Sequence, residues 1–396
     1  MAHALSTLKL PPLLQRILRK LRILPTLPPS PIQPGESVWL YNNIGYRDAA
    51  TNRWVVQFIC AYFYRGTGKD LAKVVANITT MIGLAPGADP TTEQTIANRV
   101  QPFLDTILEG KTVQVAFNQA GDGGNENQIF TLGPGGSHGV SVNDVFVAGD
   151  WREGNVVRSR AIMPGTGESS GFQSCSLINF ETRFADQEGW AVVSDIDDTI
   201  KVTEVRDRLS LLRHTFVLPP ETVPGMPEAY SRLNSLLSAP PWFYLSASPY
   251  NLFPLLSAFV ASHYPRGQLL LREMSWQELE SFIVTITMGT QQYKENELEV
   301  LIKNFPKKKW VFIGDSTQKD PEAYAAVYRR HPTNVRRIWV RLVKGVDVQK
   351  EKELNSKERL EKAFKGVPRE IWSTFEDPEV LTNEVKVMVA ADAGRV

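Results

Sequence analysis

Five short apolar runs between Trp190 and Val343 constrain the fold of this chain more than any other feature of its sequence. They occupy residues 191–194, 242–245, 268–271, 310–313 and 338–343. Each run is too short for a helix, and none alternates polar with apolar residues. Such runs are typical of central strands in a parallel sheet that helices cover on both faces. We therefore predict a Rossmann-like α/β domain over residues 190–396, ending in a charged helical segment.

Polar side chains stand directly after three of these runs. Asp195 and Asp197 follow the first run, Ser246 follows the second, and Asp315 follows the fourth, with Asp320 farther along the same loop. In open α/β sheets, ligands bind beyond the carboxyl ends of the strands. We therefore expect these side chains to share one pocket.

The pair of carboxylates spaced i, i+2 after the first run suits phosphoryl transfer. Asp195 is the expected nucleophile, which would form an aspartyl-phosphate. Asp197 is the expected general acid and base. Two like charges this close would raise one pKa, and a bound cation would reduce that effect. We expect Mg²⁺, which prefers oxygen ligands, to be held by Asp195, Asp315 and the backbone carbonyl of Asp197.

Phosphoryl transfer also needs positive charge and hydrogen-bond donors around the phosphoryl oxygens. Ser246 is placed to donate a hydrogen bond to one of these oxygens. Lys294, near a predicted helix start, supplies a fixed cation. We expect Asp320 to hold Lys294 or its own loop in place.

Taken in order, these residues resemble the four motifs of the haloacid dehalogenase superfamily, which are DxDxT, a serine or threonine after a strand, a lysine, and GDxxxxD. Segments 194–201, 224–230, 244–250 and 313–325 are similar to the catalytic domain of phosphatidate phosphatases of the fungal actin-patch-protein type, over about residues 190–345. The resemblance implies Mg²⁺-dependent hydrolysis of phosphatidate, a phospholipid, to diacylglycerol and phosphate. The proline-rich tail of the yeast type is not evident after Val343, so a role at actin patches is not implied.

Two other functions remain open. The chain could hydrolyse another amphipathic or soluble phosphate ester or diphosphate, such as a prenyl diphosphate, or be mainly a membrane-binding adaptor with slight activity. In the superfamily a large cap usually lies between the motifs, and here core elements fill most of those gaps. We therefore expect a minimal cap and an open mouth, as a lipid headgroup would require.

Residues 35–189 have a different pattern, which predicts a β-rich, sandwich-like domain with helical insertions. Runs rich in aromatic and β-branched residues predict strands at 53–64, 113–117, 128–132, 140–147 and 156–161. Helical segments are expected at 70–82 and 92–109. The role of this domain is not evident from its sequence.

Residues 1–34 form a third segment, which is free of acidic residues. Within residues 12–24, leucines and isoleucine are spaced to share one helical face, and arginine and lysine lie between them. Three interpretations fit: a helix on an anionic membrane surface, a mitochondrial transit peptide, or a helix docked on the protein body. Residues 25–34 hold five prolines and are expected to form a stiff linker.

Composition excludes several classes of function. The net charge is +1, so no global field draws the chain to nucleic acid. Only Cys60 and Cys175 occur, and neither belongs to a CxxC pair, which excludes a disulfide scaffold and argues against a thiolate zinc site. No apolar run approaches the length that a membrane-spanning helix needs. We expect a cytoplasmic, peripherally membrane-associated protein, with a mitochondrial location as the alternative, and the oligomeric state is open.

Overall fold

The computed structural model describes residues 27–66, 71–83, 89–117, 128–164, 175–273 and 289–393. The helix predicted over residues 12–24 lies outside these ranges. Within them, every helix falls short of the length and apolar character that crossing a bilayer requires.

A six-stranded sheet occupies the C-terminal half, and all its neighbouring strands are parallel, in the order β13-β12-β11-β14-β15-β16. Its strands are β11 (Trp190–Ser194), β12 (Trp242–Pro249), β13 (Gln268–Arg272), β14 (Lys309–Asp315), β15 (Val335–Arg341) and β16 (Trp372–Phe375). Each of the five apolar runs overlaps one of the first five strands, so the predicted parallel arrangement is confirmed. The sequence analysis did not identify β16.

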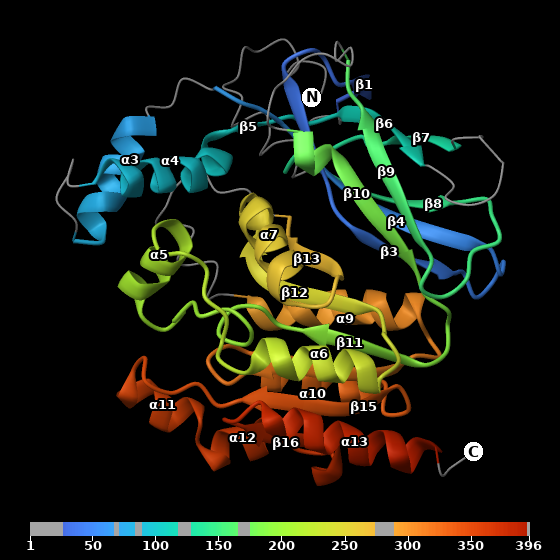
Figure 1. Ribbon diagram of the computed structural model, residues 1–396, viewed down its shortest axis with the longest axis vertical. Coiled ribbons are helices and arrows are strands. Elements are labelled where there is room, and N and C mark those ends of the chain that lie inside the picture. The colour runs from blue at the N-terminus through green and yellow to red at the C-terminus, as the bar shows by residue number, and fades with distance from the viewer. Residues whose placement is uncertain are drawn as a thin grey trace, which may run out of the picture.

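Helices cover both faces of this sheet (Figure 1). One face carries α5 (Arg208–Phe216), α6 (Met226–Leu236), α7 (Phe253–His263) and α13 (Glu379–Ala393), and the other carries α9 (Thr290–Asn304), α10 (Asp320–Arg330) and α12 (Lys357–Ala363). The remaining elements of this half are α11 (Val348–Leu354), η2 (Tyr250–Leu252) and η3 (Arg369–Ile371). Apolar side chains project from both faces of the sheet. The helices on each face therefore pack against a separate hydrophobic core.

A ten-stranded sheet of mixed direction occupies the N-terminal half and lies above the parallel sheet in Figure 1. Its strands are β1 (Ser30–Pro31), β2 (Glu36–Leu40), β3 (Asn43–Arg47), β4 (Trp54–Tyr64), β5 (Thr106–Ile107), β6 (Lys111–Phe117), β7 (Gln128–Leu132), β8 (Val140–Phe146), β9 (Val156–Ile162) and β10 (Asn179–Phe184), and η1 (Cys175–Ile178) precedes β10. The parallel pair β10–β3 joins the strands β1, β6 and β9 on one side to β4 and β2 on the other. The sheet curls, so that Phe58 of β4 and Phe117 of β6 meet edge to face in one aromatic core.

Two helices inserted into this half, α3 (Leu71–Met81) and α4 (Pro90–Leu104), pack against the parallel-sheet half. Phe103 meets Phe216 of α5 at 5.7 Å, and an Arg99 guanidinium nitrogen donates to the Leu218 carbonyl oxygen at 2.7 Å. The helix expected over 92–109 is too long. It ends at Leu104, because the next residues form β5 and pair with β4.

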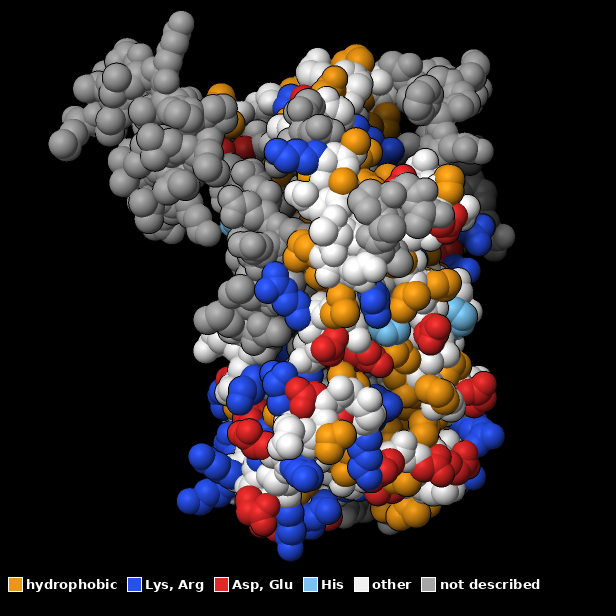
Figure 2. Space-filling view, turned by 90° about the vertical axis from the view of Figure 1, so that its left-hand side faces the viewer, with side chains coloured by type: hydrophobic (Ala, Val, Ile, Leu, Met, Phe, Trp, Pro, Cys, Tyr) orange, Lys and Arg blue, Asp and Glu red, His pale blue; other side chains and the backbone are white. Residues whose placement is uncertain are grey.

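The face that carries α3, α4 and α5 has a mixed surface (Figure 2). Basic and acidic side chains are interspersed over its lower half, with hydrophobic side chains between them. A mixed surface of this kind produces no strong field of a single sign.

Candidate active site

Three carboxylates and one lysine meet, fully buried, beyond the carboxyl ends of β11 and β14. Ligand oxygens of Asp195, Asp315 and Asp320 lie within 4.8 Å of one another. The Lys294 ammonium group donates to Asp195 Oδ1 at 2.6 Å and also to Asp320 Oδ1. All four side chains are 0% exposed. The sequence-predicted residues therefore share one site, and Asp320 holds Lys294 as expected.

Parallel strands and two helix starts position these groups. The backbone N–H of Asp195 donates to the Ile313 carbonyl oxygen at 2.9 Å, which ties the end of β11 to β14. Asp320 is the first residue of α10, and its Oδ2 accepts from the backbone N–H of Asp315 at 3.1 Å. A Cβ on Gly314 would lie 2.7 Å from the Asp320 Cβ, so only glycine allows this close approach.

Asp197 lies beside this cluster and accepts three hydroxyl hydrogen bonds. Thr203 Oγ1 donates to its Oδ1 at 2.9 Å, and Ser246 Oγ and Ser248 Oγ donate to its Oδ2 at 2.8 Å and 3.0 Å. The sequence analysis expected Ser246 to donate to a phosphoryl oxygen. In this structure the Ser246 hydroxyl donates to Asp197, and its role toward a phosphoryl oxygen stays a prediction.

A backbone cage around Asp198 fixes the loop that carries Asp197. Asp198 has a left-handed φ of 58°, which few residues other than glycine, asparagine and aspartate adopt readily. Its Oδ1 accepts from the backbone N–H groups of Thr203 and Glu204 at 3.0 Å and 2.6 Å, and its Oδ2 accepts from Val205 at 2.9 Å. Arg341 donates to the Asp198 carbonyl oxygen at 2.6 Å. The chain therefore turns back after Asp197, as a pocket-forming loop requires.

Burial and mutual repulsion set the protonation of the cluster. Burial, followed by the charge of Asp320, raises the pKa of Asp195 well above its usual value. Burial raises the pKa of Asp320 to about 6, although Lys294 opposes this shift. Burial alone would lower the pKa of Lys294, but Asp195 and Asp320 raise it overall. Lys294 is therefore a permanent cation among carboxylates that bind protons readily.

One oxygen of Asp315 is left without a partner, and this observation tests whether a metal fits. Asp315 Oδ1 accepts from both the backbone N–H and the hydroxyl of Thr317, whereas Oδ2 is buried and unpartnered in the described part of the chain. A buried carboxylate oxygen without a donor suits a hard divalent cation. Asp195, Asp315 and Asp320 are thus able to hold such an ion together.

Sequence reasoning missed Thr203, Ser248 and Thr317, which hold the carboxylates of this site. Ser248 stands two residues after Ser246, and Thr317 two residues after Asp315. This i, i+2 spacing is the signal that could have identified both residues. Thr203 had no such signal, because the turn at Asp198 returns it to Asp197.

Comparison with known proteins locates the resemblance in this half of the chain. Residues 190–342 match the family described as phosphatidate phosphatase APP1, catalytic domain. Over 165 residues the chain is 32% identical to phosphatidate phosphatase APP1 of Saccharomyces cerevisiae, and over 164 residues it is 27% identical to an uncharacterized protein of Schizosaccharomyces pombe. Each match covers 41% of this chain, and the chain spans 27% and 26% of the length of these two curated relatives.

Proposed function

We propose that this chain hydrolyses phosphatidate to diacylglycerol and phosphate, because residues 190–342 match the family described as phosphatidate phosphatase APP1, catalytic domain. The observation that carries the proposal is the placement of Lys294 between Asp195 and Asp320 at the strand ends. A buried cation beside a carboxylate nucleophile suits an anionic phosphoryl group, whose charge must be stabilised during transfer.

In the proposed mechanism, an Asp195 oxygen attacks phosphorus and forms an aspartyl-phosphate. The Thr199 hydroxyl and the Lys294 ammonium group each donate to one Asp195 oxygen, at 2.9 Å and 2.6 Å, and so fix its orientation. Asp197 protonates the leaving glyceride oxygen and then accepts a proton from the hydrolytic water. Ser246 and Ser248 orient Asp197, and a turn of the Ser246 hydroxyl would let it donate to a phosphoryl oxygen instead.

We further propose that the site requires Mg²⁺. The unpartnered Asp315 Oδ2 supports this, and Asp195, Asp315 and the backbone carbonyl of Asp197 would hold the ion, with Asp320 close by. When bound, Mg²⁺ would neutralise part of the developing phosphoryl charge. The positive charge of the ion would also oppose the burial and the repulsion that raise the pKa of Asp195 and Asp315.

We also propose a haloacid dehalogenase-type fold with a minimal cap for residues 190–396, a separate β-rich domain at 35–189, and an anionic membrane surface as the contact of residues 12–24. Deleting residues 1–26 tests the last point and keeps β1, which pairs with β6. The deletion should weaken binding to vesicles that contain anionic phospholipid. Unchanged binding would favour a transit peptide or a docked helix.

Phosphate release from a panel of substrates tests the proposed activity. The panel is phosphatidate in mixed micelles, a prenyl diphosphate and a soluble phosphomonoester, each with Mg²⁺ and with EDTA. We expect the highest kcat/KM on phosphatidate, with activity lost in EDTA and restored by Mg²⁺. A preference for the soluble ester would overturn the lipid substrate, and activity in EDTA would overturn the metal requirement. Absence of release from every substrate would favour the adaptor.

A further inference from the structure

A second polar pocket, separate from the candidate active site, lies where the two sheets meet. Its volume is about 220 Å³, and β4, β8, β13, η2 and α9 surround it. Its apolar wall consists of Ile59, Val140, Val142, Leu270, Leu271 and Val300. Its polar members include Tyr41, Glu273 and Glu297.

The two carboxylates of this pocket have no cationic partner among the residues that the structure describes. Glu297 is half-buried on α9, and Glu273 directly follows β13 at the rim. Burial, and then the charge of Glu273, raises the pKa of Glu297 to about 7, and burial raises the pKa of Glu273. Arg272, the neighbouring cation, lies over the Tyr293 ring at 5.3 Å from its centroid.

Two buried hydroxyl groups beside these carboxylates also lack a hydrogen-bond partner in the described part of the chain. Tyr41 lines the pocket, is 3% exposed, and its hydroxyl oxygen is unpartnered. The Tyr293 hydroxyl is likewise buried and unpartnered. Tyr41 lines the same pocket as Glu273 and Glu297, and Tyr293 lies one helical turn before Glu297 on α9. Buried polar groups normally have partners, so these hydroxyls are available to the polar group of a ligand.

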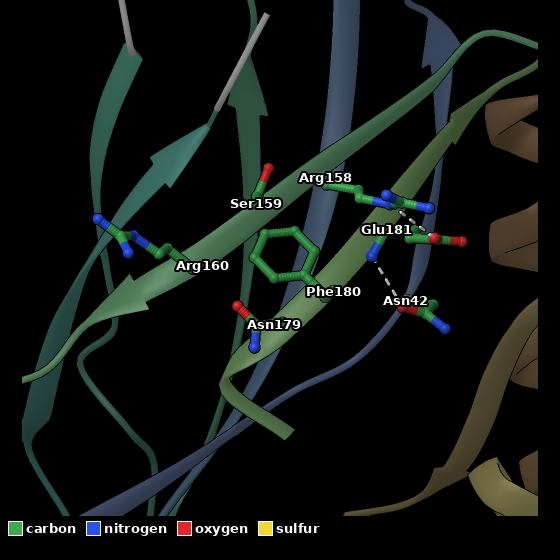
Figure 3. A pocket seen from close by; sticks show the side chains of 7 residues that line it. All are labelled: Asn42, Arg158, Ser159, Arg160, Asn179, Phe180 and Glu181. Atoms are coloured by element: carbon green, nitrogen blue, oxygen red, sulfur yellow. Dashed lines mark hydrogen bonds and ion pairs between the residues drawn. The ribbon is translucent and has the colours of Figure 1, made fainter. Parts of the chain in front are cut away.

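Another hollow, on β9 and β10, contains a carboxylate whose charge is neutralised by arginine side chains (Figure 3). There Glu181 pairs with Arg158 at 3.3 Å and with Arg266 at 2.5 Å, while Arg160 points away from this group. Its only carboxylate, among the residues that line it, is therefore neutralised by the protein. The carboxylates of the pocket between the sheets are not.

We infer that the pocket between the sheets binds the ammonium group of an amphiphilic amine. Three ammonium hydrogens match the acceptors that Glu273, Glu297 and the Tyr41 hydroxyl offer. An alkyl chain attached to that ammonium would lie against the apolar wall, where each buried CH₂ strengthens binding about fourfold. Two carboxylates disfavour an anion, and the mostly apolar lining leaves few oxygen ligands besides Gln57 and the tyrosines to complete the shell of a divalent metal ion.

The pocket lies beside the candidate active site but uses none of its residues. Glu297 stands one helical turn after Lys294, and Tyr250 of the pocket follows Ser248 by two residues. Binding of an amine is therefore an additional property, and it does not depend on the proposed hydrolysis. A chain that failed to release phosphate from any lipid could still bind the amine.

Calorimetric titration of the full chain with hexylamine, hexan-1-ol and hexanoate at pH 7.5 tests the inference. The three probes share one alkyl chain and differ in charge. We expect hexylamine to bind at least about tenfold more tightly than hexan-1-ol, as a charge-assisted hydrogen bond requires, and hexanoate not to bind. Equal binding of the three probes, or saturable binding of Mg²⁺ or Ca²⁺ that displaces hexylamine, would overturn the inference.

Three variants locate the ammonium group. Glu297→Gln and Glu273→Gln should each weaken hexylamine binding about tenfold, and Tyr41→Phe should weaken it several-fold while keeping the ring stacked on Phe253. Glu361→Gln, an equal charge change at an exposed position of α12, is the control and should leave binding unchanged. Glu273 lies at the rim, so its variant should fold even if Glu297→Gln does not. Unaltered hexylamine binding in Glu273→Gln and Tyr41→Phe would refute the site.

Discussion

The molecule contains two groups of carboxylates near one edge of the parallel sheet, and their charges are balanced in different ways. In the candidate active site, Lys294 donates to both Asp195 and Asp320, and all three side chains are fully buried. In the pocket between the sheets, Glu273 and Glu297 have no cationic partner among the described residues. Each group has a member just after a strand end, yet only the first group has its own cation.

This difference shows how a nearby cation changes the protonation of a buried carboxylate. A buried carboxylate without a counter-charge binds a proton, whereas a carboxylate beside a fixed cation stays ionised more easily. Lys294 therefore opposes the upward shift that burial imposes on the pKa values of Asp195 and Asp320, whereas no cation opposes the shift at Glu297, whose pKa is raised to about 7. The first group is organised for chemistry within the protein, and the second group is completed by a cationic ligand.

Replacing the proposed nucleophile should have the largest effect. Asp195→Asn keeps the side-chain shape but removes the attacking oxygen's charge, so phosphate release should fall about ten-thousandfold or more. The variant should melt within a few degrees of the wild type, because Lys294 retains Asp320 as a partner. Steady-state kinetics and calorimetry measure the two effects. Substantial turnover by Asp195→Asn would exclude the aspartyl-phosphate route.

Removing the cation of the first group should destabilise the fold next most strongly. Lys294→Met leaves Asp195, Asp315 and Asp320 buried without compensation, which should cost about 3–5 kcal/mol of unfolding free energy. The matched control is Lys303→Met on the exposed face of the same helix, where we expect a change within about 0.5 kcal/mol.

The pH dependence of the Lys294→Met variant sharpens this test. Without the cation, the pKa values of the three carboxyl groups rise further, so the folded state binds more protons than the unfolded state. The variant's deficit in unfolding free energy should therefore shrink as the pH falls from 8 toward about 6, where Asp320 of the wild type also becomes protonated. Urea denaturation at pH 5 and pH 8 measures it, and a deficit independent of pH would point to lost packing.

Close packing within the first group gives a smaller effect. In Gly314→Ala the new methyl group would lie 2.7 Å and 2.8 Å from the Asp320 Cβ and Cγ atoms, so Asp320 must move away from Lys294. We expect a loss of about 1–3 kcal/mol together with reduced phosphate release. Gly136→Ala is the control, because its methyl group meets only the Val140 carbonyl oxygen at 3.5 Å. Equal stability of the two variants would show that Asp320 moves at little cost.

The parallel sheet and the members of the first group could be predicted because both leave local patterns. A short apolar run that ends in a carboxylate predicts a buried strand and the place of its end, as at Asp195 and Asp315. Parallel strands then bring those ends together whatever their order in the sheet. The chemical roles of these residues stay predictions. The strand β16 (Trp372–Phe375) was missed because Ser373 and Thr374 stand between its two apolar end residues, so no apolar run marks it.

The second group could not be predicted, because no local pattern links its members. Tyr41 belongs to the N-terminal half, Glu273 follows the edge strand β13, and Glu297 lies on α9. They meet only because the two sheets pack together, and one sequence does not specify that contact. The left-handed turn at Asp198 is a similar case, since its cage depends on the backbone of residues 203–205.

The smallest effect that separates the two groups is the contribution of Glu297 to the pH dependence of the unfolding free energy. Its pKa is raised to about 7 in the folded chain, so the folded state binds more protons than the unfolded state between about pH 4.5 and pH 7. Wild-type stability should therefore decrease across that window. Glu297→Gln removes this term, so its stability relative to the wild type should rise by about 1–2 kcal/mol between pH 5 and pH 8. Thermal unfolding at both pH values measures the difference, and Glu361→Gln, which is exposed, should show none. Adding hexylamine at pH 8 should stabilise the wild type more than Glu297→Gln, because the variant keeps only Glu273 as a carboxylate for the ammonium group. A variant that gained nothing at pH 8 would mean that Glu297 is already neutralised within the protein, and the contrast between the two groups would disappear.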